Sequence, residues 1–136
     1  MAQGVWRCLM AKIVVLDDDT NTCNLIRVAL EQDRHKVTTT QHAKEAWRAI
    51  SLGADLLLLD LNLPETNGWE FAKRVRLDPG LAELPIVVIT ARSGFFDKTV
   101  ARGYDVAEFI RKPFTPAAIR ELVSKALASR ASPGPR

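Results

Sequence analysis

The segment DLLLLDLNLPETNGWE, residues 55–70, joins an apolar run to a turn. Its four consecutive leucines are apolar on both faces of an extended chain, which is expected when helices cover both faces of a parallel sheet. Because this run is the most apolar of its kind in the chain, we place it at the centre of a sheet. Asp60 ends the predicted strand, and LNLPETNG is the turn that follows it.

Similar short runs lie on both sides of this segment. KIVVLD at residues 12–17 and PIVVIT at residues 85–90 are also apolar on both faces. VAEFIRK at residues 106–112 alternates more and is expected at an edge of the sheet. KVTTTQ at residues 36–41 is a weaker pattern, but it is rich in β-branched residues. The chain therefore carries five predicted strands.

Apolar residues with helical spacing separate and follow these strands. The five stripes are Leu25, Ile26, Ala29 and Leu30; Ala43, Ala46, Trp47 and Ile50; Phe71, Ala72 and Val75; Val100 and Ala101; and Ile119, Leu122, Val123, Ala126 and Leu127. Thr115 and Pro116 provide a cap and a first-turn proline for the last helix. This alternation predicts an α/β fold: a single five-stranded parallel sheet with helices on both faces and right-handed crossovers.

The chain has the size and composition of one soluble domain, with 136 residues, 47% hydrophobic and 26% charged. We predict a leader at residues 1–11, the domain at residues 12–128, and a disordered tail or truncated linker at residues 129–136. No apolar run approaches the roughly 20 residues of a membrane helix. No secretory signal begins the sequence. A cytoplasmic protein without a membrane partner is therefore expected.

Charge and cysteine content exclude two classes of site. Three of the 19 basic residues, Arg7, Arg130 and Arg136, lie outside residues 12–129, which leaves 16 basic and 16 acidic residues in that range. This balance argues against direct nucleic-acid binding, which requires a basic face. Cys8 and Cys23 have neither the spacing of a zinc site nor the pattern of a disulfide framework.

Polar side chains follow the predicted strands at the point where each strand ends. Asp17 and Asp18 follow the first strand, Asp60 ends the third, Thr90 ends the fourth, and Lys112 follows the fifth. Ligands of open α/β sheets bind at these carboxyl ends. Clustered carboxylates repel one another unless a cation lies between them, and oxygen ligands suit Mg²⁺. A carboxylate nucleophile with a lysine and a hydroxyl nearby also suits phosphoryl transfer.

Four motifs occur together in the order and spacing of one known family: IVVLDDD, DLLLLDLNLPETNGWE, LPIVVITA and FIRKPF. From about residue 12 to residue 127, the chain thereby resembles the receiver domain of bacterial two-component response regulators. Each motif alone is a weak signal, but four in register are specific. The resemblance implies a flavodoxin-like (βα)5 fold with strand order 2-1-3-4-5.

The same resemblance implies a phospho-acceptor and a metal site. Asp60 corresponds to the carboxylate that takes up a phosphoryl group. Mg²⁺ or Mn²⁺ is expected to bind to Asp17, Asp18 and Asp60 and to the backbone carbonyl of Asn62. Asp18 is the more direct ligand of the acidic pair.

Three further positions match the family's phosphate-binding and switch residues. Lys112 corresponds to the lysine that contacts the phosphoryl group, and its bond to Pro113 is expected to be cis. Thr90 and Phe109 correspond to the two switch positions, of which Phe109 is also expected to pack in the core.

The chain departs from the family pattern at two places of interest. Asp105 stands where the family usually has glycine, so the loop before the fifth strand is expected to differ. Arg92, two residues after Thr90, occupies a variable position that commonly tunes the lifetime of the phosphoryl group.

The implied function is a phosphorylation-driven switch rather than an enzyme with turnover. The expected donor is a histidine kinase or a histidine phosphotransfer protein. The expected output is a downstream protein partner, a phosphorylation-dependent dimer or a missing effector domain. Phe95 and Phe96 are a candidate contact site, with core packing of one of them as the alternative.

Two other functions stay open at this point. One is a degenerate receiver that acts only as a binding module, although the complete residue set argues against it. The other is a haloacid-dehalogenase-like phosphatase, whose DxDx[TV] pattern requires Thr or Val where Asn21 stands. Asp19 or Thr20 is predicted to cap a helix. His35 and His42 are predicted to be surface residues beside the second strand.

Overall fold

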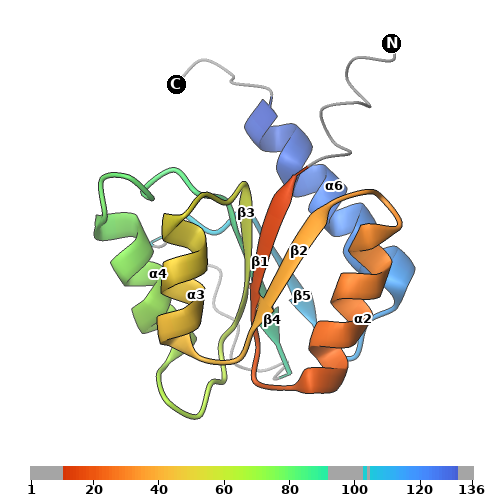
Figure 1. The fold of residues 1–136 in the computed structure, drawn as a ribbon, viewed down its shortest axis with the longest axis horizontal. Helices are drawn as coiled ribbons and strands as arrows, with labels where there is room; N and C mark the ends of the chain where they lie inside the picture. The colour runs from red at the N-terminus through yellow and green to blue at the C-terminus, as the bar shows by residue number, and fades with distance from the viewer. Residues whose placement is uncertain (1–10, 92–102, 104, 132–136) are drawn as a thin grey trace.

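The computed structural model describes residues 11–91, 103 and 105–131. Five parallel strands form one sheet in the order β2-β1-β3-β4-β5 (Figure 1). Their bounds are β1 Lys12–Leu16, β2 Lys36–Thr40, β3 Leu56–Asp60, β4 Ile86–Thr90 and β5 Glu108–Arg111. The predicted fold class and strand order are confirmed. The leucine-rich β3 lies at the centre, and the alternating β5 lies at an edge.

Four helices in the described residues cover the two faces of the sheet (Figure 1). Helices α2 (Thr20–Glu31) and α6 (Pro116–Ala131) contribute to one hydrophobic cluster, and α3 (Ala43–Ser51) and α4 (Gly68–Leu77) contribute to the other. The predicted helix with Val100 and Ala101 lies outside the described residues. Helix α6 continues to Ala131, so the first three residues of the predicted tail are helical. Within the described part, no helix is long and apolar enough to cross a membrane.

The leucine run of β3 divides between the two hydrophobic clusters. Leu56 and Leu58 join the cluster under α2 and α6, whereas Leu57 and Leu59 join the cluster under α3 and α4. All four side chains are fully buried, and burying each one contributes roughly 1.5–3 kcal/mol. Packing from both sides therefore fixes the strand that ends at Asp60.

The prediction that both histidines lie at the surface is wrong for His35. Its side chain is buried, and its Nδ1 accepts a hydrogen bond from the Ala11 N–H at 3.3 Å. Burial lowers the pKa of His35 below its usual value, and an accepting Nδ1 requires an unprotonated nitrogen. The ring is therefore a neutral part of the core. His42 is exposed, as predicted, and lies 3.1 Å from Glu65.

The loop before β5 keeps a left-handed residue even though the usual glycine is absent. Asp105 has φ +53°, a conformation that aspartate tolerates better than most residues. The guanidinium of Arg76 donates to the carbonyl oxygen of Asp105 at 3.0 Å, and also to those of Ala82 and Leu84. Arg76 therefore ties α4 to the segments that precede β4 and β5.

Candidate functional site

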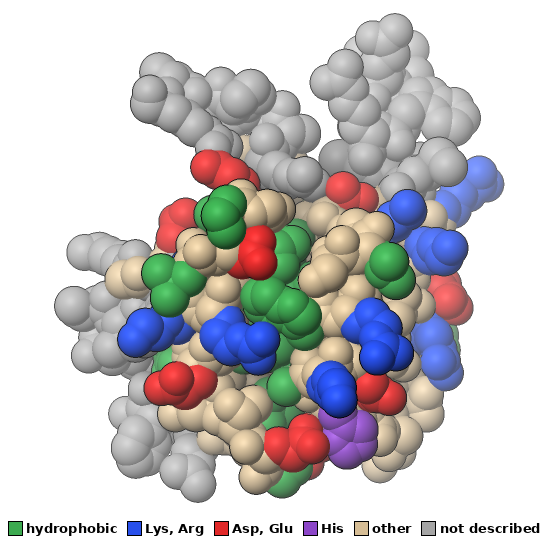
Figure 2. All heavy atoms as spheres, turned by 60° about the vertical axis from the view of Figure 1, so that its left-hand side comes forward, with side chains coloured by type: hydrophobic (Ala, Val, Ile, Leu, Met, Phe, Trp, Pro, Cys, Tyr) green, Lys and Arg blue, Asp and Glu red, His purple; other side chains and the backbone are tan. Residues whose placement is uncertain are grey.

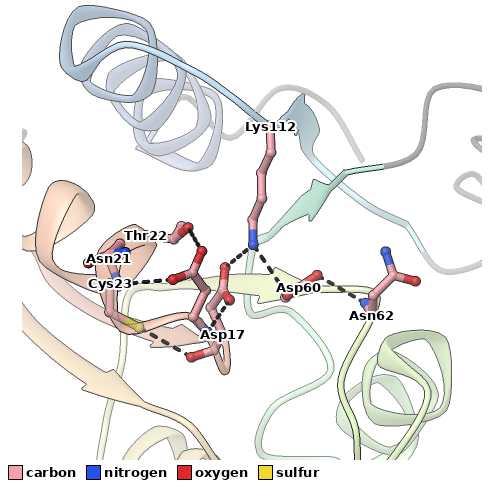
Figure 3. Close-up of polar contacts among 8 residues, drawn as sticks. Asp17, Asn21, Thr22, Cys23, Asp60, Asn62 and Lys112 are labelled. Atoms are coloured by element: carbon pink, nitrogen blue, oxygen red, sulfur yellow. Dashed lines mark hydrogen bonds and ion pairs between the residues drawn. The ribbon is translucent and has the colours of Figure 1, made fainter.

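The polar residues predicted at the strand ends meet at one edge of the sheet. Asp17 follows β1, Asp60 ends the adjacent β3, and the side chain of Lys112, which follows β5, points between these two carboxylates (Figure 3). Strand β4 lies between β3 and β5, and it ends at the buried Thr90. The backbone carbonyl of Thr90 accepts a hydrogen bond from the Lys112 N–H at 2.8 Å. The parallel order of the strands brings together residues that are far apart in the sequence.

Three carboxylates form a cluster in which one oxygen of each residue lies within 4.8 Å of the others. They belong to Asp17 and Asp60, which are buried, and to Asp18, which is exposed. Asp17 Oδ1 accepts from the Asp19 N–H at 2.9 Å. Asp17 Oδ2 lies 2.9 Å from Lys112 Nζ and forms an ion pair with it, and no other donor among the described residues reaches this oxygen.

This cluster fits a divalent cation. Buried carboxylates are costly unless cations compensate their charge, and clustered carboxylates also repel one another. Lys112 supplies one positive charge against three carboxylates. A hard, oxygen-binding ion such as Mg²⁺ suits the rest of this charge, with Asp18 open to solvent for a hydrated ion. The predicted role of the Asn62 carbonyl stays a prediction.

The environment of Asp60 disfavours its charged form when no cation is bound. Burial raises the pKa of Asp60 to about 6, and the charge of Asp17 adds to this effect. The Asn62 N–H opposes it by donating to Asp60 Oδ1 at 2.9 Å. Asp60 Oδ2 lies 3.5 Å from Lys112 Nζ. Both oxygens of the Asp60 carboxylate therefore have a partner, the Asn62 N–H for Oδ1 and the Lys112 ammonium group for Oδ2.

Lys112 stays protonated in this site. Burial alone would lower the pKa of Lys112, but the hydrogen bonds and charges of Asp17 and Asp60 outweigh burial and raise the pKa above its usual value. The bond from Lys112 to Pro113 is cis, as expected. An ammonium group therefore faces both buried carboxylates permanently.

The turn after Asp60 requires glycine at position 68. A Cβ at Gly68 would lie 2.6 Å from both the Asp60 carbonyl oxygen and the Leu61 Cα, closer than packed atoms approach. The Gly68 N–H donates to the Leu61 carbonyl, and Asn62 pairs with Asn67 across the turn. The turn borders an open hollow of about 580 Å³ beside Asp18. Helix α4 thus begins directly against the backbone of Asp60 and Leu61.

Asp19 is a helix cap and not a member of the carboxylate cluster, which confirms the prediction for it. Its side chain accepts from the Asn21 N–H and the Thr22 hydroxyl at the start of α2. The bond from Thr22 is the main cause of a lowered pKa of Asp19. These contacts hold the Asp19 carboxylate at the start of α2.

Cys23 is a neighbour of the site that belongs to none of the motifs identified in the sequence. Its Sγ–H donates to the Asp17 carbonyl at 3.2 Å (Figure 3). Burial, together with the charges of Asp17 and Asp19, raises the pKa of Cys23 to about 11, so it remains a thiol. The only sign of this contact in the sequence is that Cys23 lies in the first turn of α2, a few residues after Asp17.

The two predicted switch residues lie on adjacent strands. Thr90 ends β4, whereas Phe109 lies on β5 and is 42% exposed. The expectation that Phe109 packs in the core is therefore wrong for this structure, in which Phe109 belongs to neither hydrophobic cluster. Arg92, Phe95 and Phe96 lie outside the described residues, and the coupling predicted between Thr90 and Phe109 stays a prediction.

Comparisons with known proteins agree with this geometry. The sequence model of the family described as response regulator receiver domain matches residues 13–124. The chain is 33% identical to chemotaxis protein CheY1 of Helicobacter pylori over 87% of this chain and 98% of that protein. It is 30% identical to response regulator SaeR of Staphylococcus aureus over 84% of this chain and 48% of SaeR.

A solved structure has the same fold. Chemotaxis response regulator CheY4 of Vibrio cholerae aligns with a TM-score of 0.79 and 24% identity, covering 86% of this chain and 98% of that one. At this identity the likeness shows the fold alone. Together with the family match over residues 13–124 and the carboxylate cluster, it leads to one conclusion. The chain belongs to the response regulator receiver domains of two-component signal transduction.

Proposed function

We propose that Asp60 accepts a phosphoryl group from a histidine kinase or a histidine phosphotransfer protein, and that this charge switches a protein-interaction surface. The observation that carries the proposal is the position of Asp60. It is a buried carboxylate within 3.5 Å of the Lys112 ammonium and within 4.8 Å of two further carboxylates. Asp17, Asp18, Asp60 and the Asn62 carbonyl would hold Mg²⁺ or Mn²⁺. The bound ion would neutralise carboxylate and phosphoryl oxygens.

The chemistry needs few groups. A carboxylate oxygen of Asp60 forms a bond to phosphorus while the bond from phosphorus to the donor nitrogen breaks, and the leaving imidazole takes a proton from water. Lys112 and the Thr90 hydroxyl contact the phosphoryl oxygens. Hydrolysis of the acyl phosphate later returns the free carboxylate. One phosphoryl group is taken up and lost in each cycle, so the protein acts as a switch.

Mass spectrometry with a small phosphodonor tests this function directly. With acetyl phosphate and Mg²⁺, the protein is expected to gain the mass of one phosphoryl group, and chelation of the metal should prevent the gain. Asp18→Asn should raise the Mg²⁺ concentration required, because the exposed Asp18 contributes charge to the metal site without packing in the core. A protein that gains no mass in Mg²⁺ would instead be a degenerate receiver that acts only by binding. Repeated release of phosphate from esters would indicate a phosphatase.

We also propose that phosphorylation alters the surface around β5. A phosphoryl group on Asp60 would attract the Thr90 hydroxyl, because hydrogen bonds to charged groups are stronger than neutral ones. An inward move of Thr90 leaves room for the half-exposed Phe109 on the adjacent strand. Such a local change biases a two-state element, and a partner, a second copy or an effector domain would respond to it.

Amide hydrogen exchange with and without a phosphoryl mimic measures this coupling. Exchange is expected to change at Thr90 and from Glu108 to Lys112 as well as at the Asp60 turn. A change confined to residues 60–68, with β5 silent, would contradict it.

A further inference from the structure

The face of the molecule formed by α3 and α4 carries four cations without acidic partners. Lys44 and Arg48 of α3 and Lys73 and Arg74 of α4 are all exposed. In the described part of the chain, none of them lies within ion-pair distance of a carboxylate. Figure 2 shows Lys and Arg side chains lying across this face, with hydrophobic side chains between and above them. This concentration of charge contrasts with the balanced total of the domain.

Contacts across the seam between the two helices join these cations into one surface. The Arg74 guanidinium of α4 lies 4.4 Å from the centre of the Trp47 ring of α3. That ring meets Phe71 edge-on, with centroids 6.0 Å apart and an interplanar angle of 81°. Phe71 is buried, so it supports the Trp47 ring from the side of the core. The Arg74 guanidinium lies over the face of the same ring. Lys44 precedes Trp47 by three residues on α3, and residues three apart lie on the same face of a helix, so cations of both helices share the face of the half-buried indole.

Two strongly exposed leucines end the same two helices. Leu52, the C-cap of α3, is 83% exposed, and Leu77, the last residue of α4, is 72% exposed. Helices that connect parallel strands of one sheet run in the same direction, so both leucines lie at the same end of this face. A single exposed leucine needs no explanation. Two of them beside an unpaired basic surface match the apolar and charged parts of a protein docking site.

We infer that the α3–α4 face, defined here by Lys44, Trp47, Arg48, Leu52, Lys73, Arg74 and Leu77, binds an acidic amphipathic helix of a partner protein. Leucine-like side chains of that helix would cover Leu52, Leu77 and the exposed edge of Trp47. Its carboxylates would lie against the four cations. This site goes beyond the proposed phosphorylation switch, because none of these residues belongs to the carboxylate cluster or to β5.

Charge and shape favour a protein partner over nucleic acid or lipid. Glu45 and Glu70 are exposed on the same two helices, and they would repel a phosphate backbone or an anionic membrane. Phosphate groups also give no contact to Leu52 and Leu77. A partner helix can place its own cations opposite the two glutamates, whereas a uniform anion cannot.

A synthetic helical peptide of about 18 residues, with leucines at i, i+3, i+4 and i+7 flanked by glutamates, is the probe for this surface. Titration into the isotope-labelled protein should shift the amide resonances of α3 and α4 and leave those of α2 and α6 in place. For the double variant Arg48→Gln/Lys73→Gln, the Kd of the complex with the peptide should rise at least about fivefold. Arg27→Gln/Lys125→Gln removes the same charge from α2 and α6 and should bind as the wild type does.

A second pair of variants tests the apolar part. Leu52→Ser/Leu77→Ser should also weaken binding at least about fivefold, whereas Val28→Ser, at a position 58% exposed on α2, should not. These positions are exposed, so the variants are expected to fold. Phosphoryl uptake measured on the same samples separates a failure of this surface from a failure of the proposed switch.

Three results would overturn the inference. The first is the absence of α3–α4 shifts at millimolar peptide. The second is equal loss of binding in the α2–α6 charge variant, which would indicate unspecific attraction. The third is binding of duplex DNA or anionic vesicles through the same residues in preference to the peptide.

Discussion

Asp60→Asn is expected to abolish phosphoryl uptake and, at the same time, to stabilise the metal-free protein. Loss of uptake follows because the amide lacks the nucleophilic carboxylate oxygen. Stabilisation follows because burial and the charge of Asp17 disfavour the ionised Asp60 in the fold. An Asn side chain keeps an oxygen that can accept from the Asn62 N–H. The variant is expected to lose phosphoryl uptake while its free energy of unfolding rises. A misfolded protein would lose both uptake and stability.

The pH dependence of this stabilisation has a defined direction. Burial raises the pKa of Asp60 from its ordinary value of 3.8 to about 6 in the folded protein, so the folded state binds the proton more tightly than the unfolded state. The contribution of protonated Asp60 to the free energy of unfolding is therefore complete below about pH 4, and it is lost as the pH rises to about 6. The stability gained by Asp60→Asn should grow over that window and level off above it, at no more than about 3 kcal/mol.

Urea denaturation at several pH values without Mg²⁺ measures the stabilisation, and mass spectrometry measures uptake. Asp33→Asn is the matched control. Its hydrogen bond with Arg120 lowers the pKa of Asp33, so neutralising it should cost up to about 1 kcal/mol above pH 4. If Asp60→Asn retained labelling, another residue would be the acceptor.

The sequence is sufficient to predict those parts of the fold that depend on local pattern. The β3 leucines are buried on both faces, as a doubly apolar run indicates, and the alternating β5 is an edge strand. Asp17, Asp60 and Lys112 were found because each directly ends or follows a strand. Their convergence needed only the rule that parallel strands present their carboxyl ends at one edge. The strand order itself came from the resemblance.

The features that the sequence could not reveal depend on contacts between distant segments. His35 is buried because it accepts a hydrogen bond from Ala11, 24 residues away, and no local pattern distinguishes it from His42. In the sequence, Arg76 looks like any other charged residue of an amphipathic helix. In the structure, its guanidinium donates to the backbone carbonyl of Asp105, 29 residues away. Asp105 keeps a left-handed turn without glycine because the surrounding contacts favour that conformation.

Lys112→Met is expected to be the most destabilising single change in the site. Lys112 Nζ lies 2.9 Å from Asp17 Oδ2 and 3.5 Å from Asp60 Oδ2, and the Asp17 side chain is fully buried. Methionine has a similar length and apolar stem, so the substitution removes the charge with little loss of packing. Breaking a buried ion pair by removing one partner costs about 3–5 kcal/mol, because the remaining charge is left without compensation.

Lys125→Met is the matched control for Lys112→Met. Lys125 lies 3.5 Å from Glu108, the same distance as Lys112 from Asp60, but its side chain is 70% exposed against 19% for Lys112. Solvent screens such a pair, and its loss should cost no more than about 1 kcal/mol. The difference between the two variants in urea denaturation without metal therefore isolates the effect of burial around Asp17.

Mg²⁺ should restore part of the stability that Lys112→Met removes. A cation in the carboxylate cluster neutralises Asp17 and Asp60 in place of the lost ammonium, and saturation to about 100 times the Kd contributes about 2.7 kcal/mol. The variant should nevertheless take up phosphoryl groups slowly, because a contact to the phosphoryl oxygens is missing. Equal destabilisation by Lys112→Met and Lys125→Met would show that Asp17 does not depend on Lys112. Recovery by Mg²⁺ without recovery of uptake would show that metal and lysine act on the phosphoryl group separately.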